Sequence, residues 1–398
     1  MFSLTASGQV GFEKNGSEIS SNLESQTIFP ASLIVSSFSP AFSPACSSSA
    51  LCPKMIDNAY NFTALHKNGI NGNGQAVVIV DACGDPKIVS DLHTFDSKFG
   101  LNDPTLNIFT PQGTPCSNTS WAIETALDVE WAHVVAPNAN IDLVETNSSS
   151  GSDLFGAWKF SLSNDLGNQI SNSWGGNGNC SSSVINTLSK AVSKHVTILA
   201  SSGDSGAWGQ GGFGKPQKPA DCQGILTVGG TTLSVNSTGG YLGESAWSGS
   251  GGGYVLGVPE PSYQLAANIN DQFGTLAKSD VSAVADPFTG VWVFISGQGW
   301  LVVGGTSVSC PLWAGFMALV NQIRASHRHF APAGFINPFL YSTVYGPNGN
   351  SAVYANDFHD VKTGSNGWAA GTGWDVPTGL GSFRAFNLAQ TLGTNATA

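Results

Sequence analysis

The fold is decided around one stretch, Gly304-Gly305-Thr306-Ser307-Val308-Ser309-Cys310-Pro311, in which a glycine turn leads into the apolar segment 312–318. The pattern predicts a helix that begins beside Ser307 and has Pro311 in its first turn. The Ser307 hydroxyl would then lie at a helix N-terminus, where backbone amides favour negative charge. A serine that merely caps a helix after a glycine turn has the same pattern, so a nucleophile needs further support.

A serine nucleophile requires a neighbouring base, and no histidine in this sequence has a convincing setting for that role. Carboxylates fit better. In the segment 121–131, apolar residues recur at helical spacing and place Glu124 and Asp128 one turn apart on one face. A solvated acidic face is the alternative interpretation of this pair.

A third carboxylate follows an apolar run at 196–200, which ends in Ser202-Gly203-Asp204-Ser205-Gly206. The run predicts a buried parallel strand, and Asp204 would lie at its carboxyl end. Functional sites of open α/β sheets form at that edge, although aspartate in such a loop is also a common turn residue.

Apolar runs alternate with helical patterns along the chain, and this alternation predicts an α/β fold with a mostly parallel sheet and helices on both faces. The predicted strands lie at 76–81, 141–145, 196–200, 225–228 and 300–303, and the predicted helices near 86–98, 120–134, 152–165, 182–194 and 310–327.

The composition favours a folded acidic protein. Hydrophobic residues make up 41% of the chain, and 15 Lys and Arg against 26 Asp and Glu give a formal net charge of -11 at pH 7. This balance argues against nucleic acid or an anionic membrane as a partner. Because basic residues are few, little positive charge remains once the carboxylates are protonated, which suits an acidic environment.

Together, these motifs resemble the sedolisins, the serine-carboxyl peptidases with a subtilisin-like doubly wound fold. The resemblance runs from about Ile56 to Leu392 and includes Gly-Gly-Thr-Ser307, Ser-Gly-Asp204-Ser-Gly and the Glu124 and Asp128 pair. It implies that Ser307 is the nucleophile, Glu124 the general base, Asp128 its partner and Asp204 the oxyanion-hole acid.

The implied chemistry requires opposite protonation states. Glu124 must be ionised to take the Ser307 proton, whereas Asp204 donates to an oxyanion only when it is protonated. We therefore expect an acid-active endopeptidase or tripeptidyl-peptidase that forms an acyl-enzyme, with an optimum at about pH 3 to 5. Protein or peptide substrates would pair with the backbone around Ser171, Ser173, Trp174 and Gly175.

Two alternatives compete with this function. A subtilisin-type peptidase would use Asp81 as its acid, but the sequence lacks the matching histidine helix start. A catalytically silent, Ca²⁺-stabilised binding or structural protein is disfavoured because all four catalytic residues are intact.

The resemblance also implies one structural Ca²⁺ ion near the C-terminus. Its ligands would be the two carboxylates and three backbone carbonyls of Asp360, Val361, Gly371, Gly373 and Asp375. From the residues alone, these segments are two ordinary turns.

Residues 1–45 form a Ser- and Pro-rich arm with a predicted extended strand at 33–35, and residues 46–398 form the catalytic domain. Since family precursors carry a long propeptide, we interpret the arm as a remnant, a replacement, or the cut end of a longer precursor. Neither a signal peptide nor a membrane-length apolar run is evident. We expect a monomer.

Seven cysteines indicate an oxidising location, either extracellular or an acidic lumen. Sequence cannot fix connectivity, but we expect Cys46 with Cys52, Cys83 with Cys116, and Cys180 with Cys222. Cys310 is left as a buried free thiol, and a nucleophilic Cys310 lacks a histidine to activate it.

Overall fold

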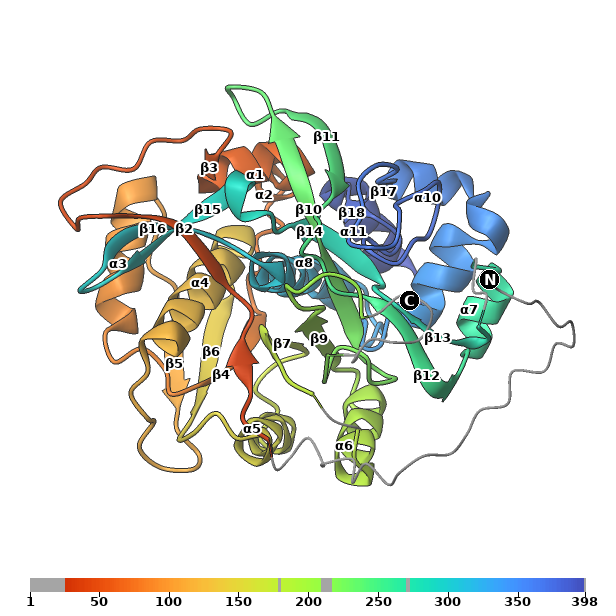
Figure 1. Ribbon diagram of the computed structural model, residues 1–398, viewed down its shortest axis with the longest axis horizontal. Helices are drawn as coiled ribbons and strands as arrows, with labels where there is room; N and C mark the ends of the chain where they lie inside the picture. Colours follow the sequence, from red (N-terminus) through yellow and green to blue (C-terminus); the bar gives the residue numbers. More distant parts are fainter. Residues whose placement is uncertain (1–25, 178–179, 209–216, 270–272, 397–398) are drawn as a thin grey trace, which may run out of the picture.

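The structure is a computed structural model that describes residues 26–177, 180–208, 217–269 and 273–396 (Figure 1). The first 25 residues of the predicted arm lie outside the described part. The predicted extended strand at 33–35 is confirmed as part of β2 (Leu33–Phe38).

A large sheet forms the centre of the described chain, in the order β17-β18-β14-β10-β9-β7-β4-β6-β5, with β11 paired to β10. All pairings from β5 to β18 are parallel, whereas β11 and β17 pair antiparallel. Its strands are β4 (Ala76–Ala82), β5 (Leu106–Phe109), β6 (Asn140–Thr146), β7 (Gln169–Ser171), β9 (Thr197–Ser201), β10 (Leu226–Val235), β11 (Tyr241–Ala246), β14 (Val281–Val284), β17 (Phe358–His359) and β18 (Ser382–Phe383).

Helices cover both faces of this sheet, as predicted. Along β4, Val77 and Ile79 belong to one apolar core, whereas Val78 and Val80 belong to a second core on the opposite face. The helices are α1 (Pro53–Tyr60), α2 (Phe62–Lys67), α3 (Ile88–Phe99), α4 (Thr119–Val135), α5 (Gly151–Ser163), α6 (Ser182–Ser193), α7 (Ser262–Ala267), α8 (Thr306–Ser326), α9 (Asn337–Phe339), α10 (Ala352–Asp357) and α11 (Ala385–Thr394).

The predicted strand at 300–303 exists but does not belong to the parallel sheet. It is part of β16 (Gly299–Gly304), which pairs antiparallel with β15 (Gly290–Ile295) in a four-stranded sheet. A short hairpin joins the two strands, and such a connection is available only to antiparallel neighbours. The other members of this sheet are β2 and β3 (Ala50–Leu51).

Helix α8 begins at Thr306, so Ser307 lies in its first turn, but the expectation for Pro311 was wrong. Pro311 lies inside the helix, one turn after Ser307, and cannot donate to the Ser307 carbonyl. The helical hydrogen bond that residue 311 would donate to the Ser307 carbonyl is therefore absent. The hydroxyl of Ser173 lies 3.5 Å from that carbonyl.

Residues 26–38 cross the edge of the sheet where the catalytic candidates lie. β1 (Phe29–Pro30) pairs antiparallel with β8 (Trp174–Gly175), and β2 pairs antiparallel with β16. In Figure 1 this red segment runs from β16 past the central strands towards α5. Two further strands, β12 (Gly253–Pro259) and β13 (Thr275–Lys278), form a separate antiparallel pair.

All three expected disulfides are confirmed, Cys46 with Cys52, Cys83 with Cys116, and Cys180 with Cys222. Within the described residues, Cys310 is the free cysteine, and it is buried. No helix in the described ranges combines the length and the apolar character needed to cross a bilayer.

Candidate active site

Ser307 is fully buried at the start of α8, directly after the turn at Gly305. Gly305 has φ 110°, a conformation that strains any residue with a side chain. A Cβ there would also lie 2.3 Å from the Ala31 carbonyl oxygen and 2.4 Å from Oδ2 of Asp204. The absent side chain thus leaves room for a carbonyl and a carboxyl beside Ser307.

The carboxyls of Glu124 and Asp128 project from α4, which packs against α8. Asn118 caps the start of this helix, and its side chain accepts hydrogen bonds from the N–H groups of Ser120 and Trp121. Both carboxyl residues are fully buried, so α4 does not present the solvated acidic face that was the alternative interpretation.

Ser173 connects the two helices. Its hydroxyl lies 2.7 Å from Oδ1 of Asp128, and its carbonyl accepts from the Ser307 hydroxyl at 3.4 Å. The structure therefore brings Ser307, Asp128 and the backbone of Ser173 into one cluster.

Burial raises the pKa of Glu124 well above its ordinary value, and the neighbouring charge of Asp81 raises it further. The hydroxyls of Ser307 and Ser32 lower this pKa, because they favour the ionised carboxylate. Burial and the charges of Asp81 and Glu124 likewise raise the pKa of Asp128. These acids cannot all be ionised together, so they titrate as a group.

Asp81 is the residue of this group that sequence reasoning did not place with the catalytic carboxylates. It lies in β4, is fully buried, and has a pKa raised by burial to about 8. Its position near the carboxyl end of a parallel strand was the available signal.

Asp204 lies beside Gly305 and Thr306, which directly precede Ser307. Its Oδ1 accepts hydrogen bonds at 2.8 Å from both the backbone N–H and the hydroxyl of Thr306. Its Oδ2 is buried and has no partner among the described residues. Burial raises the pKa of Asp204 to about 7, although the Thr306 bonds oppose this shift, so the carboxyl is protonated in acid.

The segment 171–175, whose backbone was expected to bind substrate, is divided between the strands β7 and β8. Trp174 and Gly175 form β8, which pairs with β1, and the carbonyl of Ser173 accepts from the Ala31 N–H at 3.1 Å. Ser171 instead ends β7, and its hydroxyl lies 3.4 Å from Sγ of Cys310.

Cys310 is surrounded by groups that do not activate a thiol. Burial raises its pKa to about 12, and the Asp128 charge contributes to the increase. A thiolate would therefore be scarce at acidic and neutral pH. His133, the histidine on α4, is buried 3.4 Å from Asp96.

The expected calcium ligands meet in one loop region near the C-terminus. Oδ1 of Asp360 accepts from the Gly373 N–H at 3.0 Å, and Oδ2 of Asp375 accepts from the Gly371 N–H at 2.9 Å. The two carboxyls are close enough for the charge of Asp360 to raise the pKa of Asp375. Val361, which follows Asp360, is buried.

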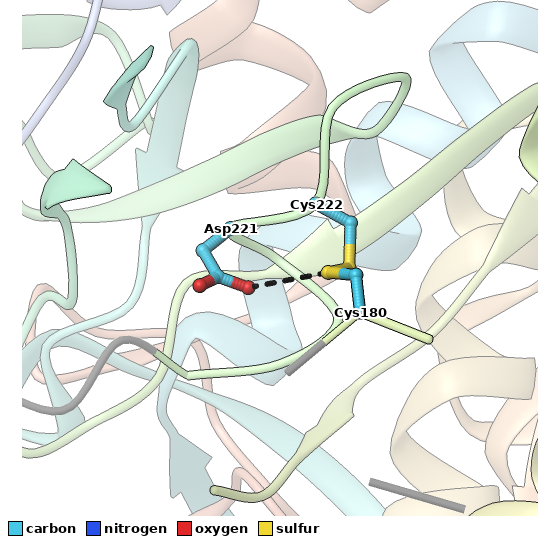
Figure 2. Close-up of side chains that lie close together, drawn as sticks. All are labelled: Cys180, Asp221 and Cys222. Atoms are coloured by element: carbon cyan, nitrogen blue, oxygen red, sulfur yellow. Dashed lines mark hydrogen bonds between the residues drawn. A yellow bond between two sulfur atoms is a disulfide. The ribbon is translucent and has the colours of Figure 1, made fainter. Parts of the chain in front are cut away.

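A second cluster of metal-ligand types, Cys180, Asp221 and Cys222, does not suit a metal ion (Figure 2). The two cysteines form a disulfide and offer no thiolate. Asp221 forms an ion pair with Lys218.

Comparison with known proteins shows which family the chain resembles. A family model described as "Subtilase family" matches residues 113–348, more than half of the chain. Kumamolisin from Bacillus sp. (strain MN-32) is 31% identical over 387 residues, which cover 88% of this chain and 65% of kumamolisin. Tripeptidyl-peptidase 1 from Homo sapiens is 29% identical, with 85% of this chain and 64% of that protein covered. The chain thus spans slightly less than two thirds of these relatives.

A solved structure of Pseudomonas sedolisin, a serine-carboxyl proteinase complexed with pseudo-iodotyrostatin, matches with a TM-score of 0.76 at 24% identity. The match covers 88% of this chain and 100% of that one, and it confirms the subtilisin-like fold. The chain belongs to the subtilase family, and the proteins to which it is similar include kumamolisin and sedolisin.

Proposed function

We propose that this chain is an acid-active serine-carboxyl peptidase that cleaves protein or peptide substrates through an acyl-enzyme on Ser307. The observation that carries the proposal is the convergence of Ser307, the buried Glu124 and Asp128 pair, and the unpartnered Oδ2 of Asp204 around one point. Similarity to kumamolisin and sedolisin supports the same assignment.

In the proposed mechanism, Glu124 takes the proton of the Ser307 hydroxyl as its oxygen attacks the substrate carbonyl carbon. Asp128 shares negative charge with Glu124 and is held by the Ser173 hydroxyl. Because the two buried acids are coupled, a single charge on the pair is enough for Glu124 to act as base.

The oxyanion that forms would accept from the backbone N–H of Ser307 and from protonated Asp204. Asp204 can donate through Oδ2, since Thr306 occupies Oδ1. The proton then passes from Glu124 to the leaving amine, and water hydrolyses the ester by the reverse sequence.

Acid activity follows from these protonation states. Activity rises as the Glu124 and Asp128 pair loses its first proton, and falls as Asp204 loses its proton at about pH 7. The optimum should lie on the acidic side of that value.

We also propose that Asp360 and Asp375, with the carbonyls of Val361, Gly371 and Gly373, hold one structural Ca²⁺ ion. The donor set fits a hard cation, because it combines two carboxylates with carbonyls on a glycine-rich loop. The ion would supply folding stability.

Residues 46–398 would form the catalytic domain and residues 1–45 a separate arm. Three disulfides support an extracellular or acidic lumenal location. The proposed activity is tested by hydrolysis of acid-denatured protein over a pH series, compared between the wild type and Ser307→Ala.

A further inference from the structure

The side chain of Gln217 lies between two backbone segments that border the candidate active site. Gln217 is half-buried, and a Cβ at Gly175 in β8 would overlap its amide. A Cβ at Gly203 would overlap the same amide, and Gly203 has φ 101°, a conformation that favours glycine. We call the region bordered by Gly175, Gly203 and Gln217 the side-chain site.

The backbone on both sides of Gln217 is fixed to this part of the fold. Gly176 and Lys218 exchange two backbone hydrogen bonds at 2.9 Å, which hold Gln217 beside the end of β8. The disulfide between Cys180 and Cys222 joins the same two segments a few residues further on (Figure 2). The amide of Gln217 is therefore presented by a fixed backbone.

The side-chain site lies next to the carbonyl that would be attacked. The Ser307 hydroxyl lies 3.4 Å from the carbonyl of Ser173, the residue that precedes β8. Asp204, the proposed oxyanion donor, directly follows Gly203. A carbonyl carbon held between Ser307 and Asp204 would have β8 on one side and the Gly203 loop on the other. The side chain of that residue, which precedes the cleaved bond, would then meet the Gln217 amide.

The side-chain site offers hydrogen bonds but no free negative charge. The amide of Gln217 carries a donor and an acceptor and does not ionise. Two acids lie in the adjoining segments, and both are engaged. Asp221 forms an ion pair with Lys218. Asp204 is protonated in acid, because burial raises its pKa to about 7.

We propose that Gln217 is a specificity-determining residue, which meets the side chain before the cleaved bond and selects uncharged side chains over Lys and Arg. This inference rests on the proposed function and names its substrate class: protein or peptide segments with an uncharged residue before the cleaved bond.

Desolvation is the physical basis of this selection. A Lys or Arg side chain between the two glycine backbones would lose water without gaining a carboxylate partner. An uncharged side chain such as Leu does not incur this loss, and the carboxamide of a substrate Gln can bond to the Gln217 amide. A carboxylate at position 217 would reverse the preference, because a hydrogen bond between two charged groups is stronger than one between neutral groups.

The test begins with a map of the bonds that the wild type cuts in an acid-denatured protein, determined by mass spectrometry. We expect few of these bonds to follow Lys or Arg. A peptide that contains the fastest cleaved bond is then made with Gln, Lys, Leu or Phe before that bond. The measurement is kcat/KM for each peptide at about pH 5, where an ordinary glutamate, with a pKa of about 4.3, is ionised.

Gln217→Glu should raise the ratio of kcat/KM for the Lys peptide to that for the Gln peptide on the order of tenfold or more. Gln223→Glu is the matched control, because it adds the same charge at an exposed residue of the same segment. It should change this ratio by no more than about twofold.

Gln217→Ala provides a second test, which does not introduce a charge. The variant enlarges the side-chain site and should raise the ratio of kcat/KM for the Phe peptide to that for the Leu peptide by about threefold or more. This ratio decides the question if circular dichroism shows that Gln217→Glu does not fold.

Frequent cleavage after Lys or Arg by the wild type would overturn the inference. Unchanged peptide ratios in the folded Gln217 variants would do the same, and so would folded variants that cleave no peptide, because Gln217 would then act in catalysis. In each case the proposed function stands if hydrolysis by the wild type is lost in Ser307→Ala. If hydrolysis does not depend on Ser307, the proposed function itself fails.

Discussion

Asp204 is fixed to the residue before the nucleophile: its Oδ1 accepts from both the backbone N–H and the hydroxyl of Thr306 at 2.8 Å. Its buried Oδ2 has no partner among the described residues. This oxygen lies beside the Ala31 carbonyl oxygen, next to the position that a Cβ of Gly305 would take. One oxygen therefore positions the carboxyl, and the other is available to donate when it carries a proton.

Asp204→Asn should shift the alkaline limit of activity upward from about pH 7, the pKa of Asp204. The amide oxygen can keep the Thr306 bonds, while its NH₂ group donates without needing acid. Asp204→Ala lacks any donor and should lose on the order of a hundredfold in kcat or more. The measurement is the pH profile of kcat for all three proteins.

Circular dichroism over the same pH range is the control, since unfolding would also limit activity. An intact Asp204→Asn protein with an unshifted alkaline limit would show that another group sets this limit.

The folded protein should be most stable in acid. Burial raises the pKa of Asp81 and Asp96 to about 8 and that of Glu145 to about 7, above the values of about 4 expected in the unfolded chain. A raised native pKa contributes stability that is fully present below about pH 4 and is lost as the pH rises through 7 to 8. Urea unfolding at pH 4 and pH 8 measures the difference.

Glu145→Gln should make this pH dependence smaller, because an amide does not ionise and its oxygen can still accept from the Asp85 N–H. Asp165→Asn, at a highly exposed side chain, is the matched control and should leave the dependence unchanged. Greater stability of the wild type at pH 8 than at pH 4 would contradict the account.

Calcium should contribute to stability rather than to chemistry. Chelation of the wild type, or Asp375→Ala, should lower Tm, because an ion that binds only the native state is lost. Chelator should have no further effect on Asp375→Ala. An unchanged wild-type Tm, together with no calcium by elemental analysis, would refute the site.

Ser173→Ala should lower kcat by about tenfold and leave KM within about twofold. The variant loses the hydroxyl that lies 2.7 Å from Asp128 but keeps the carbonyl that accepts from Ala31. Ser309→Ala is the control. It removes a buried hydroxyl within α8, which donates to the Thr306 carbonyl, and so tests for a general effect of losing a hydroxyl near Ser307. A change confined to KM would place the role of the hydroxyl in substrate binding.

Local patterns predicted the strands at 76–81 and 196–200 because buried parallel strands are continuous apolar runs. The run at 300–303 has the same pattern, yet it joins a different sheet, since an apolar run does not specify its neighbour. Pro311 was misplaced because proline is usual in the first turn of a helix, whereas α8 begins at Thr306 and has Pro311 one turn after Ser307.

The catalytic candidates were found through sequence motifs. The residues that surround them could not be found in this way, because they are brought there by contacts between segments that are distant in sequence. Asp81 was considered only for a different mechanism, although it lies beside Glu124 and raises its pKa. The position of Ala31 at Ser307 could not be inferred, because the arm has no periodic pattern and its pairing with β8 is a tertiary contact.

The most direct test of the central claim compares Ser307→Ala with Cys310→Ser in the hydrolysis of acid-denatured protein at the acid optimum. Both residues are fully buried in the first turns of α8, so the pair controls for a general effect on the helix. We predict that Ser307→Ala loses essentially all activity and that Cys310→Ser retains most of it. Full activity in Ser307→Ala, or its loss only in Cys310→Ser, would contradict the assignment of Ser307 as the nucleophile.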